Sequence, residues 1–183
     1  MQKLLTAILA VMCFIGMSIA AEAASIAQSS QQTAVVIVGN ADYRTKDLIE
    51  CTKDYFKPVS GELATGKDVQ NKYQKYWFDK GLIEEGKPTK EDFIAFANYA
   101  GYNKVIFLVI KDSVLEQHGR KKGKDRSRIS LTVNAFLVDR NHIKESASAT
   151  NEEDSKTSEL RAKRGAFKQC VKEISQVFNP ILK

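Results

Sequence analysis

Two neighbouring segments of the sequence constrain the fold most, because each has the pattern of a β-strand. KVIFLVI (residues 104–110) is apolar on both faces, as is typical of a strand in the middle of a covered sheet. RISLTVNAFLVD (residues 128–139) alternates between apolar side chains and polar Ser, Thr and Asn side chains, as in a strand with one buried face. The charged stretch GRKKGKDRSR (residues 119–128) separates the two segments. We therefore expect a long β-hairpin with this basic run at its tip.

The rest of the chain alternates between strand and helix signals. AVVIVGN (residues 34–40) is a short β-branched run that indicates a buried strand, and a brief strand is expected around residues 62–65. The polar segment 140–155 predicts a connection, in which a short third strand around residues 143–147 is left open. Apolar residues at three- and four-residue steps predict helices over about residues 45–57, 68–80, 89–100 and 158–182. Thr45 and Thr89 are the expected starts of two of these helices.

This order of elements predicts the fold class. Strands and helices follow each other as β-α-(β)-α-α-β-β-α, which favours a single-domain α/β sandwich. We expect a mixed sheet with a long β-hairpin, covered by helices that include a long C-terminal helix.

The amino terminus has the composition of a secretory signal peptide. Lys3 precedes an apolar stretch over residues 4–20, and an A-x-A pattern ends at Ala23. A retained membrane anchor is the competing interpretation, because the stretch is just long enough to span a bilayer. We expect a signal peptide over residues 1–23, a polar leader over 24–33 and one α/β domain over 34–183. The mature protein would then be exported, periplasmic or extracellular, with no transmembrane segment.

The net charge of +6 is concentrated in the basic run. Six residues of the run are positive, and Asp125 is its one negative residue. The positive residues are Arg120, Lys121, Lys122, Lys124, Arg126 and Arg128. The other 22 Lys and Arg nearly cancel the other 21 Asp and Glu, so the remainder of the chain is close to neutral.

Export and composition restrict what the basic run can bind. Nucleic acid is not expected, because it lies inside the cell and the run has no interleaved aromatic side chains for base stacking. An acidic protein patch, anionic lipid, lipopolysaccharide or cell-wall polymer would suit its charge. The alternative is a solvated loop that keeps the hairpin soluble.

The sequence has no specific motif for catalysis. His118 and His142 lack the spacing partners of a zinc site, and no serine stands in G-x-S-x-G. The turn after residues 34–40 lacks the glycine motifs of phosphate-binding loops. Asp42 and Asp139, at expected strand ends, are a candidate carboxylate pair. We therefore expect no enzyme, no metal and no cofactor, with an envelope hydrolase as an alternative.

Two cysteines, Cys51 and Cys170, remain after the predicted cleavage. An even number of cysteines in an oxidising compartment favours a disulfide. By the chain-entropy model, a bond that closes so long a loop would contribute about 4–5 kcal/mol. Two buried free thiols that act as small apolar side chains are the alternative.

The element order resembles a known architecture. The strand VVIVGN, the helix through Tyr55, the strands GYNKVIFLVI and SLTVNAFLVDRN and the terminal helix are similar to the fold shared by the amino-terminal domain of TolB and the curli-secretion lipoprotein CsgG. Gly101-Tyr102-Asn103 stands where those families have a turn before a strand, and Leu137-Val138-Asp139 stands where a later strand ends. The resemblance covers about residues 35–182.

The resemblance implies an envelope protein that works by docking on partners. In the resembled fold the first and last helices can lie side by side, which would bring Cys51 and Cys170 together. The chain lacks a lipidated cysteine and the long stretch that builds a secretion pore in CsgG, so no pore is expected.

The sequence thus predicts a secreted or periplasmic, non-enzymatic module that binds an envelope protein partner, in envelope assembly or secretion. The basic hairpin tip and the adjacent strand edge are the candidate surfaces, since an exposed edge can accept a strand from another chain. A module that binds anionic lipid or cell-wall polymer through the tip is the first alternative.

Overall fold

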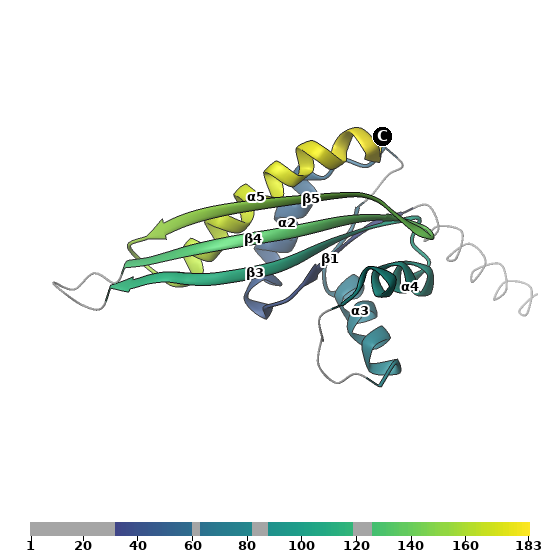
Figure 1. The fold of residues 1–183 in the computed structure, drawn as a ribbon, viewed down its shortest axis with the longest axis horizontal. Coiled ribbons are helices and arrows are strands. Elements are labelled where there is room, and N and C mark those ends of the chain that lie inside the picture. The colour runs from purple at the N-terminus through teal and green to yellow at the C-terminus, as the bar shows by residue number, and fades with distance from the viewer. Residues whose placement is uncertain (1–31, 60–62, 82–87, 119–125) are drawn as a thin grey trace, which may run out of the picture.

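The computed structural model describes residues 32–59, 63–81, 88–118 and 126–183. One five-stranded sheet has the strand order β2-β1-β3-β4-β5 (Figure 1). Its strands are β1 (Thr33–Val38), β2 (Leu63–Ala64), β3 (Lys104–His118), β4 (Arg126–Asp139) and β5 (His142–Ser155). β2, β1 and β3 are parallel, whereas β4 and β5 follow as antiparallel neighbours. The predicted mixed α/β fold is therefore confirmed.

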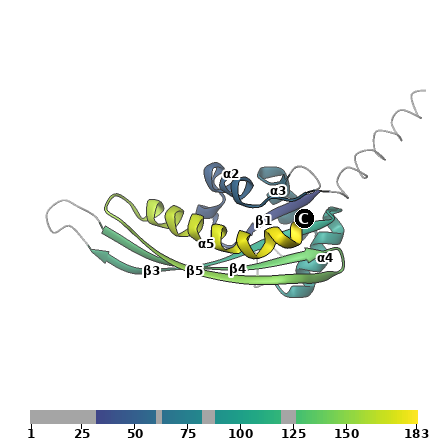
Figure 2. The same cartoon turned by 90° about the horizontal axis from the view of Figure 1, so that it is seen from above.

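Helices cover both faces of this sheet. They are the short 3-10 helix η1 (Ala41–Tyr43) and the α-helices α2 (Lys46–Tyr55), α3 (Lys67–Asp79), α4 (Lys90–Ala100) and α5 (Glu159–Leu182). α2 and α5 pack in the core on one face, and α3 and α4 pack in the core on the other. Figure 2 shows α5 lying along β4 and β5. The predicted start of α4 is confirmed, since Thr89 and Asp92 form a reciprocal capping box, and Gly101 ends the helix with a φ of 73°.

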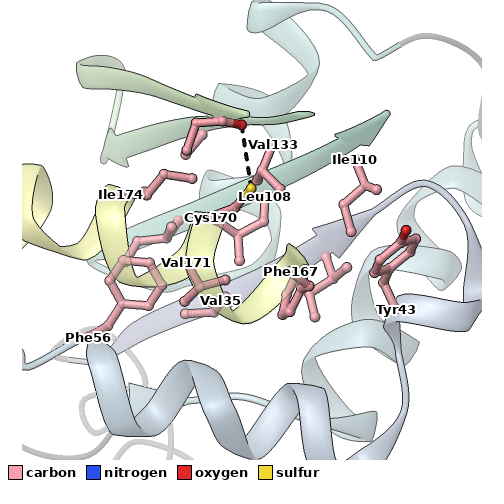
Figure 3. Packing of buried hydrophobic residues seen from close by; sticks show 14 of the residues in the cluster. Val35, Tyr43, Phe56, Leu108, Ile110, Val133, Phe167, Cys170, Val171 and Ile174 are labelled. Carbon is pink, nitrogen blue, oxygen red and sulfur yellow. Dashed lines mark hydrogen bonds between the residues drawn. The ribbon is translucent and has the colours of Figure 1, made fainter. Parts of the chain in front are cut away.

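Two hydrophobic cores result, one on each face of the sheet. The core under α2 and α5 packs Val35, Leu108 and Val133 of the sheet against Phe167 and Ile174 (Figure 3). The second core is rich in aromatic rings, which come from α3, α4 and β3. Its large buried side chains are Tyr73, Tyr76, Trp77, Phe93, Phe96 and Phe107.

The α3–α4 layer covers the sheet at one end only (Figure 1). On β3 its core includes Val105 and Phe107, with Val109 at the margin. Farther along the same face, Lys111 and Ser113 are exposed. The outer part of β3, β4 and β5 therefore forms an arm that is covered by α5 on one face and open on the other.

The predicted hairpin is confirmed, and both of its strands are longer than expected. β3 continues to His118, and its pairing with β4 runs from Lys104 opposite Asp139 to His118 opposite Arg126. The hairpin therefore closes around residues 119–125, which lie outside the described residues.

The segment 140–155, predicted as a connection with a short strand left open around residues 143–147, instead contains the 14-residue strand β5, His142–Ser155. Its side chains alternate between exposed and half-buried along most of its length. The alternation is weak in the sequence, because the side chains that face α5 include the small Ala147 and Ala149, and the other face is polar. The interpretation as a connection was wrong because hydrophobicity carries little signal in such a strand.

Candidate binding site

A pocket with a basic lining lies between the amino-terminal ends of α2 and α3. Its volume is about 340 Å³. The residues around it are Arg44, Lys46, Ile49, Glu50, Gly66 and Lys67. Three are cationic and one is anionic, so the lining has an excess of positive charge.

The topology of the sheet places this pocket. The chain leaves the carboxyl end of β1 toward α2 on one face, and it leaves the carboxyl end of β2 toward α3 on the other. Crevices at the carboxyl ends of parallel strands, where connections leave to opposite faces, are the usual ligand sites of α/β sheets. Arg44 is fixed at this end, because its Nη2 donates a 2.8 Å hydrogen bond to the Gly39 carbonyl oxygen.

The two helices present their amino termini without a side-chain cap. Thr45, the N-cap of α2, makes no side-chain capping hydrogen bond. Gly66, the N-cap of α3, has no side chain that could make one. Gly66 has a φ of 99°, a conformation that favours glycine. The first backbone N–H groups of a helix carry partial positive charge, which adds to that of Arg44, Lys46 and Lys67. An anionic group is therefore the ligand that this pocket suits.

A second charged cluster lies nearby, where η1, β3 and α5 meet. The Lys163 Nζ is 2.9 Å from Asp42 Oδ2, 2.9 Å from Glu159 Oε1 and 3.4 Å from Asp112 Oδ2. The Tyr43 hydroxyl donates to Asp112 Oδ2 at 3.2 Å. Because the Lys163 side chain is 9% exposed, this cluster ties the end of β1 to β3 and α5 through a nearly buried cation.

The pKa shifts of this cluster keep its groups in their ordinary protonation states. Burial by itself would lower the pKa of Lys163, but the surrounding carboxylates raise it above the usual value for lysine. Burial, together with Asp112, raises the pKa of the Tyr43 phenol well above its usual range. At neutral pH Lys163 is charged and Tyr43 is neutral, so neither can act as a general base or nucleophile.

The structure describes part of the basic run that the sequence singles out. Arg120, Lys121, Lys122 and Lys124 lie outside the described residues, and only the backbone of Arg126 is described. Arg128 is exposed on β4, where its Nη2 pairs with Glu152 Oε2 of β5. Glu152, Glu153 and Asp154 all lie opposite β4 beside the hairpin tip. The base of the tip is therefore a mixed surface, in which an acidic stretch of β5 accompanies the basic run.

The other residues that the sequence analysis considered for chemistry are spread apart. Asp42 follows the carboxyl end of β1, whereas Asp139 is opposite Lys104 at the other end of the sheet. His118 ends β3 near the tip, whereas His142 begins β5 at the opposite end, where α3 and α4 cover the sheet. Within the described ranges, no three His, Cys, Asp or Glu residues are placed to hold a metal ion.

Cys51 and Cys170 are both buried and both free, so the expected disulfide is not formed in this structure. The predicted neighbourhood of the two helices is correct, since Arg164 of α5 pairs with Asp47 of α2. The Cys170 sulfur, however, points to the sheet, 3.6 Å from the carbonyl oxygens of Leu131 and Ala149 (Figure 3). Burial raises the pKa of both thiols, which keeps them protonated.

Two residues that organise this end of the sheet, Gln70 and Lys163, were not expected from the sequence. Gln70 is buried on α3, and its amide bonds both backbone groups of Ile37 in β1. Lys163 stands within the apolar stripe of α5, four residues before Phe167. A polar side chain on the apolar face of a helix is the signal that could have found both, because such a side chain needs a buried partner.

No helix in the described part of the chain combines the length and apolarity required to cross a membrane. No family model matches the sequence. No curated protein matches it either.

Solved structures with a similar arrangement include several bacterial lipoproteins. Lipoprotein GNA1162 from Neisseria meningitidis is 17% identical, with a TM-score of 0.40 over 82% of this chain and 96% of that one. The PelC dodecamer from Paraburkholderia phytofirmans is 12% identical, with a TM-score of 0.32 over 84% and 88%. The rare lipoprotein B from Shewanella oneidensis is 8% identical, with a TM-score of 0.23 over 82% and 89%. None of the three is TolB or CsgG, and at these TM-scores no function is inferred from the likeness.

Proposed function

We propose that this protein is a non-enzymatic binding module of the bacterial cell envelope that docks on an envelope protein through an acidic segment of that partner. The observation that carries the proposal is the basic pocket formed by Arg44, Lys46 and Lys67 at the amino termini of α2 and α3. The predicted signal peptide supports the location in the envelope.

The size and charge of the pocket favour a single anionic group. A volume of about 340 Å³ lies at the lower end of the range for small-molecule sites, about 300–1,000 Å³. Three cations and two uncapped helix termini would give a carboxylate or phosphate several donors at once. Ile49 adds an apolar wall, against which the methylene groups of an Asp or Glu side chain could pack.

A protein partner is favoured over a lipid surface by the surroundings of the pocket. A module that binds membrane peripherally combines basic residues with exposed apolar side chains that enter the lipid. The exposed large apolar side chains in the described ranges are Val59, Phe78, Tyr99, Leu160 and Val177, and none of them lines the pocket. The charge of the pocket thus has no adjoining apolar anchor from that set.

The state of the buried polar groups supports a binding role rather than catalysis. Lys163 remains charged, Tyr43 remains neutral and both described thiols remain protonated. Groups in these states hold a fold together, whereas an acid-base catalyst needs a pKa near the working pH.

The test measures binding of a fluorescent oligoglutamate peptide by anisotropy. Lys46→Glu/Lys67→Glu reverses two charges of the pocket, and Lys90→Glu/Lys172→Glu makes the same change in charge at exposed positions that do not line it. We expect the pocket variant to bind at least about tenfold more weakly, a loss of roughly 1.4 kcal/mol, and the control variant to bind like the wild type. Equal loss in both variants, or no binding by the wild type, would contradict the proposal.

Two further arms separate the alternatives. A chain in which the six cations of GRKKGKDRSR become Gln tests the hairpin tip, and it should retain peptide binding if the pocket is the site. Vesicles that contain phosphatidylglycerol test the lipid alternative. Binding to vesicles that is lost with the tip cations, while the peptide does not bind, would favour the anionic-surface module instead.

A further inference from the structure

The outer edge of β5 is the longest unpaired backbone edge among the described strands. β5 forms one end of the sheet, and within the described residues no strand pairs with its outer side. Fourteen residues, His142–Ser155, therefore present a row of backbone donors and acceptors. An edge of this kind is a template for a further strand.

The middle of β5 lacks the devices that normally prevent such pairing. It has no proline and no glycine, and residues 146–150, SASAT, are small and uncharged. The charged residues gather toward the two ends, with Lys144 and Glu145 near the start and the acidic residues of 152–154 near the finish. One register irregularity lies at the very beginning, opposite Leu137 and Val138. The middle of the β5 edge is therefore accessible and has a regular strand geometry.

From this charge pattern we infer that β5 pairs in antiparallel fashion with β5 of a second copy of this chain, about a two-fold axis at Ser148. Antiparallel partners that continue a sheet place directly opposed residues on the same face. In this register Lys144 opposes Glu152 of the other copy. The two-fold symmetry generates two such pairs, one on each side of the axis. The remaining opposed pairs after the register irregularity are Glu145 with Asn151, Ser146 with Thr150, and Ala147 with Ala149. Ile143 lies before the irregularity and packs in the α3–α4 core, whereas Glu153 faces Gly165 of α5, so these two residues do not share a face.

The neighbouring registers are less favourable. Moving the axis to Ala149 opposes Glu145 to Glu153, which places two like charges together on each side of the axis. Moving it to Ala147 shortens the overlap and opposes Lys144 to Thr150, so the lysine loses the acidic partner on the second copy and keeps only Asp139 of its own chain. The Ser148 register pairs Lys144 with an acid and opposes no like charges.

Glu152 can serve this contact and its existing one together. It already pairs with Arg128 of β4 within the same chain. A carboxylate has two oxygens and several acceptor sites, so Lys144 of the second copy can be added to the pair. Lys144 already lies 3.6 Å from Asp139 Oδ2 of its own chain, and its three N–H donors allow it to contact both carboxylates. The Arg128 contact fixes the Glu152 side chain on the exposed face of the arm before the second copy arrives.

The helix layer also fits this arrangement. α5 covers β4 and β5, and strands are spaced by about 4.8 Å, so the two α5 helices would lie roughly 10 Å apart across the axis. Packed helices are typically 8–10 Å apart. Glu173 lies on the side of α5 that faces the β5 edge, since it accepts a hydrogen bond from Asn151 of β5. Val177, one turn farther on, is 45% exposed and would be covered by the second helix.

The dimer would be closed and would extend the sheet from five strands to twice that number. The other edge, β2, has only two residues and offers no comparable partner, so growth beyond a dimer is not expected. This inference concerns the β5 edge, which is separate from the basic pocket, and it does not depend on the proposed function.

The first experiment exchanges charges. Lys144→Glu opposes two acids across the axis, and Glu152→Lys opposes two lysines, so each variant alone should dimerise at least about tenfold more weakly in analytical ultracentrifugation. Mixing the two single variants should restore a dimer, because each acid then opposes a lysine. The two substituted side chains meet on one side of the axis, and the unchanged Lys144 and Glu152 meet on the other. Restoration by mixing is an outcome that simple misfolding of either variant cannot produce.

The second experiment fixes the register by crosslinking, in a Cys13→Ser background. Ser148→Cys places two cysteines opposite each other on the axis, where opposed Cα atoms lie about 4.5–5.5 Å apart, within the range for a disulfide. Ser146→Cys is the matched control, since it lies on the same strand and face but opposes Thr150. Mild oxidation should crosslink Ser148→Cys rapidly and Ser146→Cys slowly. A wild type that is monomeric at about 100 μM, or equal crosslinking of both variants, would overturn the inference.

Discussion

The two edges of the sheet differ in how their backbone groups are satisfied. At one edge β2 pairs with β1 only at Thr33 and Ala34, and beyond it the Gln70 side chain takes the place of a strand. Its Oε1 accepts from Ile37 N–H at 3.0 Å, and its Nε2 donates to the Ile37 carbonyl oxygen at 2.9 Å. At the other edge β5 runs for 14 residues with no such cover from the described part of the chain. A side-chain amide can thus close a short edge, whereas a long one needs another strand.

The difference suggests a division of roles between the two sides of the molecule. The β2 side is held by Gln70, and the buried Lys163 cluster ties the end of β1 to β3 and α5. The β5 side is a uniform backbone surface with charges at its ends. We expect ligand binding at the first side to depend on a rigid scaffold, and assembly at the second to depend on the free edge.

The largest effect on stability is expected for Lys163→Met. It leaves Asp42, Asp112 and Glu159 without their shared cation, and loss of one partner in a buried ion pair costs about 3–5 kcal/mol. We expect a loss at the lower end of this range, about 3 kcal/mol, because the three carboxylates are partly exposed. Urea denaturation measures the free energy of unfolding, with the exposed Lys168→Met on the same helix as control. A loss below about 1 kcal/mol would show that the cluster contributes little to the closed side of the sheet.

The pH dependence of this effect follows from the raised pKa of Lys163. A lysine whose pKa is higher in the folded than in the unfolded protein stabilises the fold fully below the unfolded value of about 10.4. That contribution is lost only as the pH rises above it. The stability difference between wild type and Lys163→Met should therefore stay constant from about pH 6 to pH 9.

A smaller loss is expected for Gln70→Ala, which removes the clamp on β1. The N–H and C=O groups of Ile37 would lose their partners, and each unsatisfied buried group costs about 1–3 kcal/mol. We expect a total loss of about 2–3 kcal/mol by urea denaturation. Gln74→Ala, at an exposed position one turn along the same helix, should change stability by less than about 0.5 kcal/mol. Similar values for both variants would mean that the short edge does not need the amide.

The smallest effect is expected from reductant, because Cys51 and Cys170 are free in the structure. The melting temperature should change by less than about 1 °C, whereas loss of a disulfide contributing about 4 kcal/mol would lower it by several degrees. Both thiols should react with an aromatic disulfide reagent only after denaturant is added, since they are buried and protonated. A large fall in melting temperature would restore the disulfide predicted from the sequence.

Most of the fold could be predicted from the sequence, because most of its elements have strong local patterns. The hairpin, the helix from Thr89 to Gly101 and the long α5 follow from alternation, a capping box and an apolar stripe. For β5 the sequence leaves open only a short strand around residues 143–147, because Ala147, Ala149 and polar residues give little alternation in hydrophobicity. Its strand state comes from pairing with β4 and packing against α5.

The candidate site was less predictable than the fold. The pocket joins residues of α2 to Gly66 and Lys67 of α3, which are about 20 positions later in the sequence, and no motif connects them. The sequence instead drew attention to the basic run, whose Arg128 proves to be paired with an acidic neighbour on β5. The number of charged residues in a segment does not show which oppositely charged side chains the fold places next to that segment.

Except for most of β5, the sequence by itself determined which segments are helices and strands, since periodicity and capping act over a few residues. It also determined the two-sided covering of β3, because its apolar side chains alternate between both faces. Only the tertiary structure decided that Lys163 and Gln70 are buried with partners, that both described thiols are free, and that β5 is an open edge. These properties depend on contacts between distant segments, and such contacts leave no periodic trace in either segment alone.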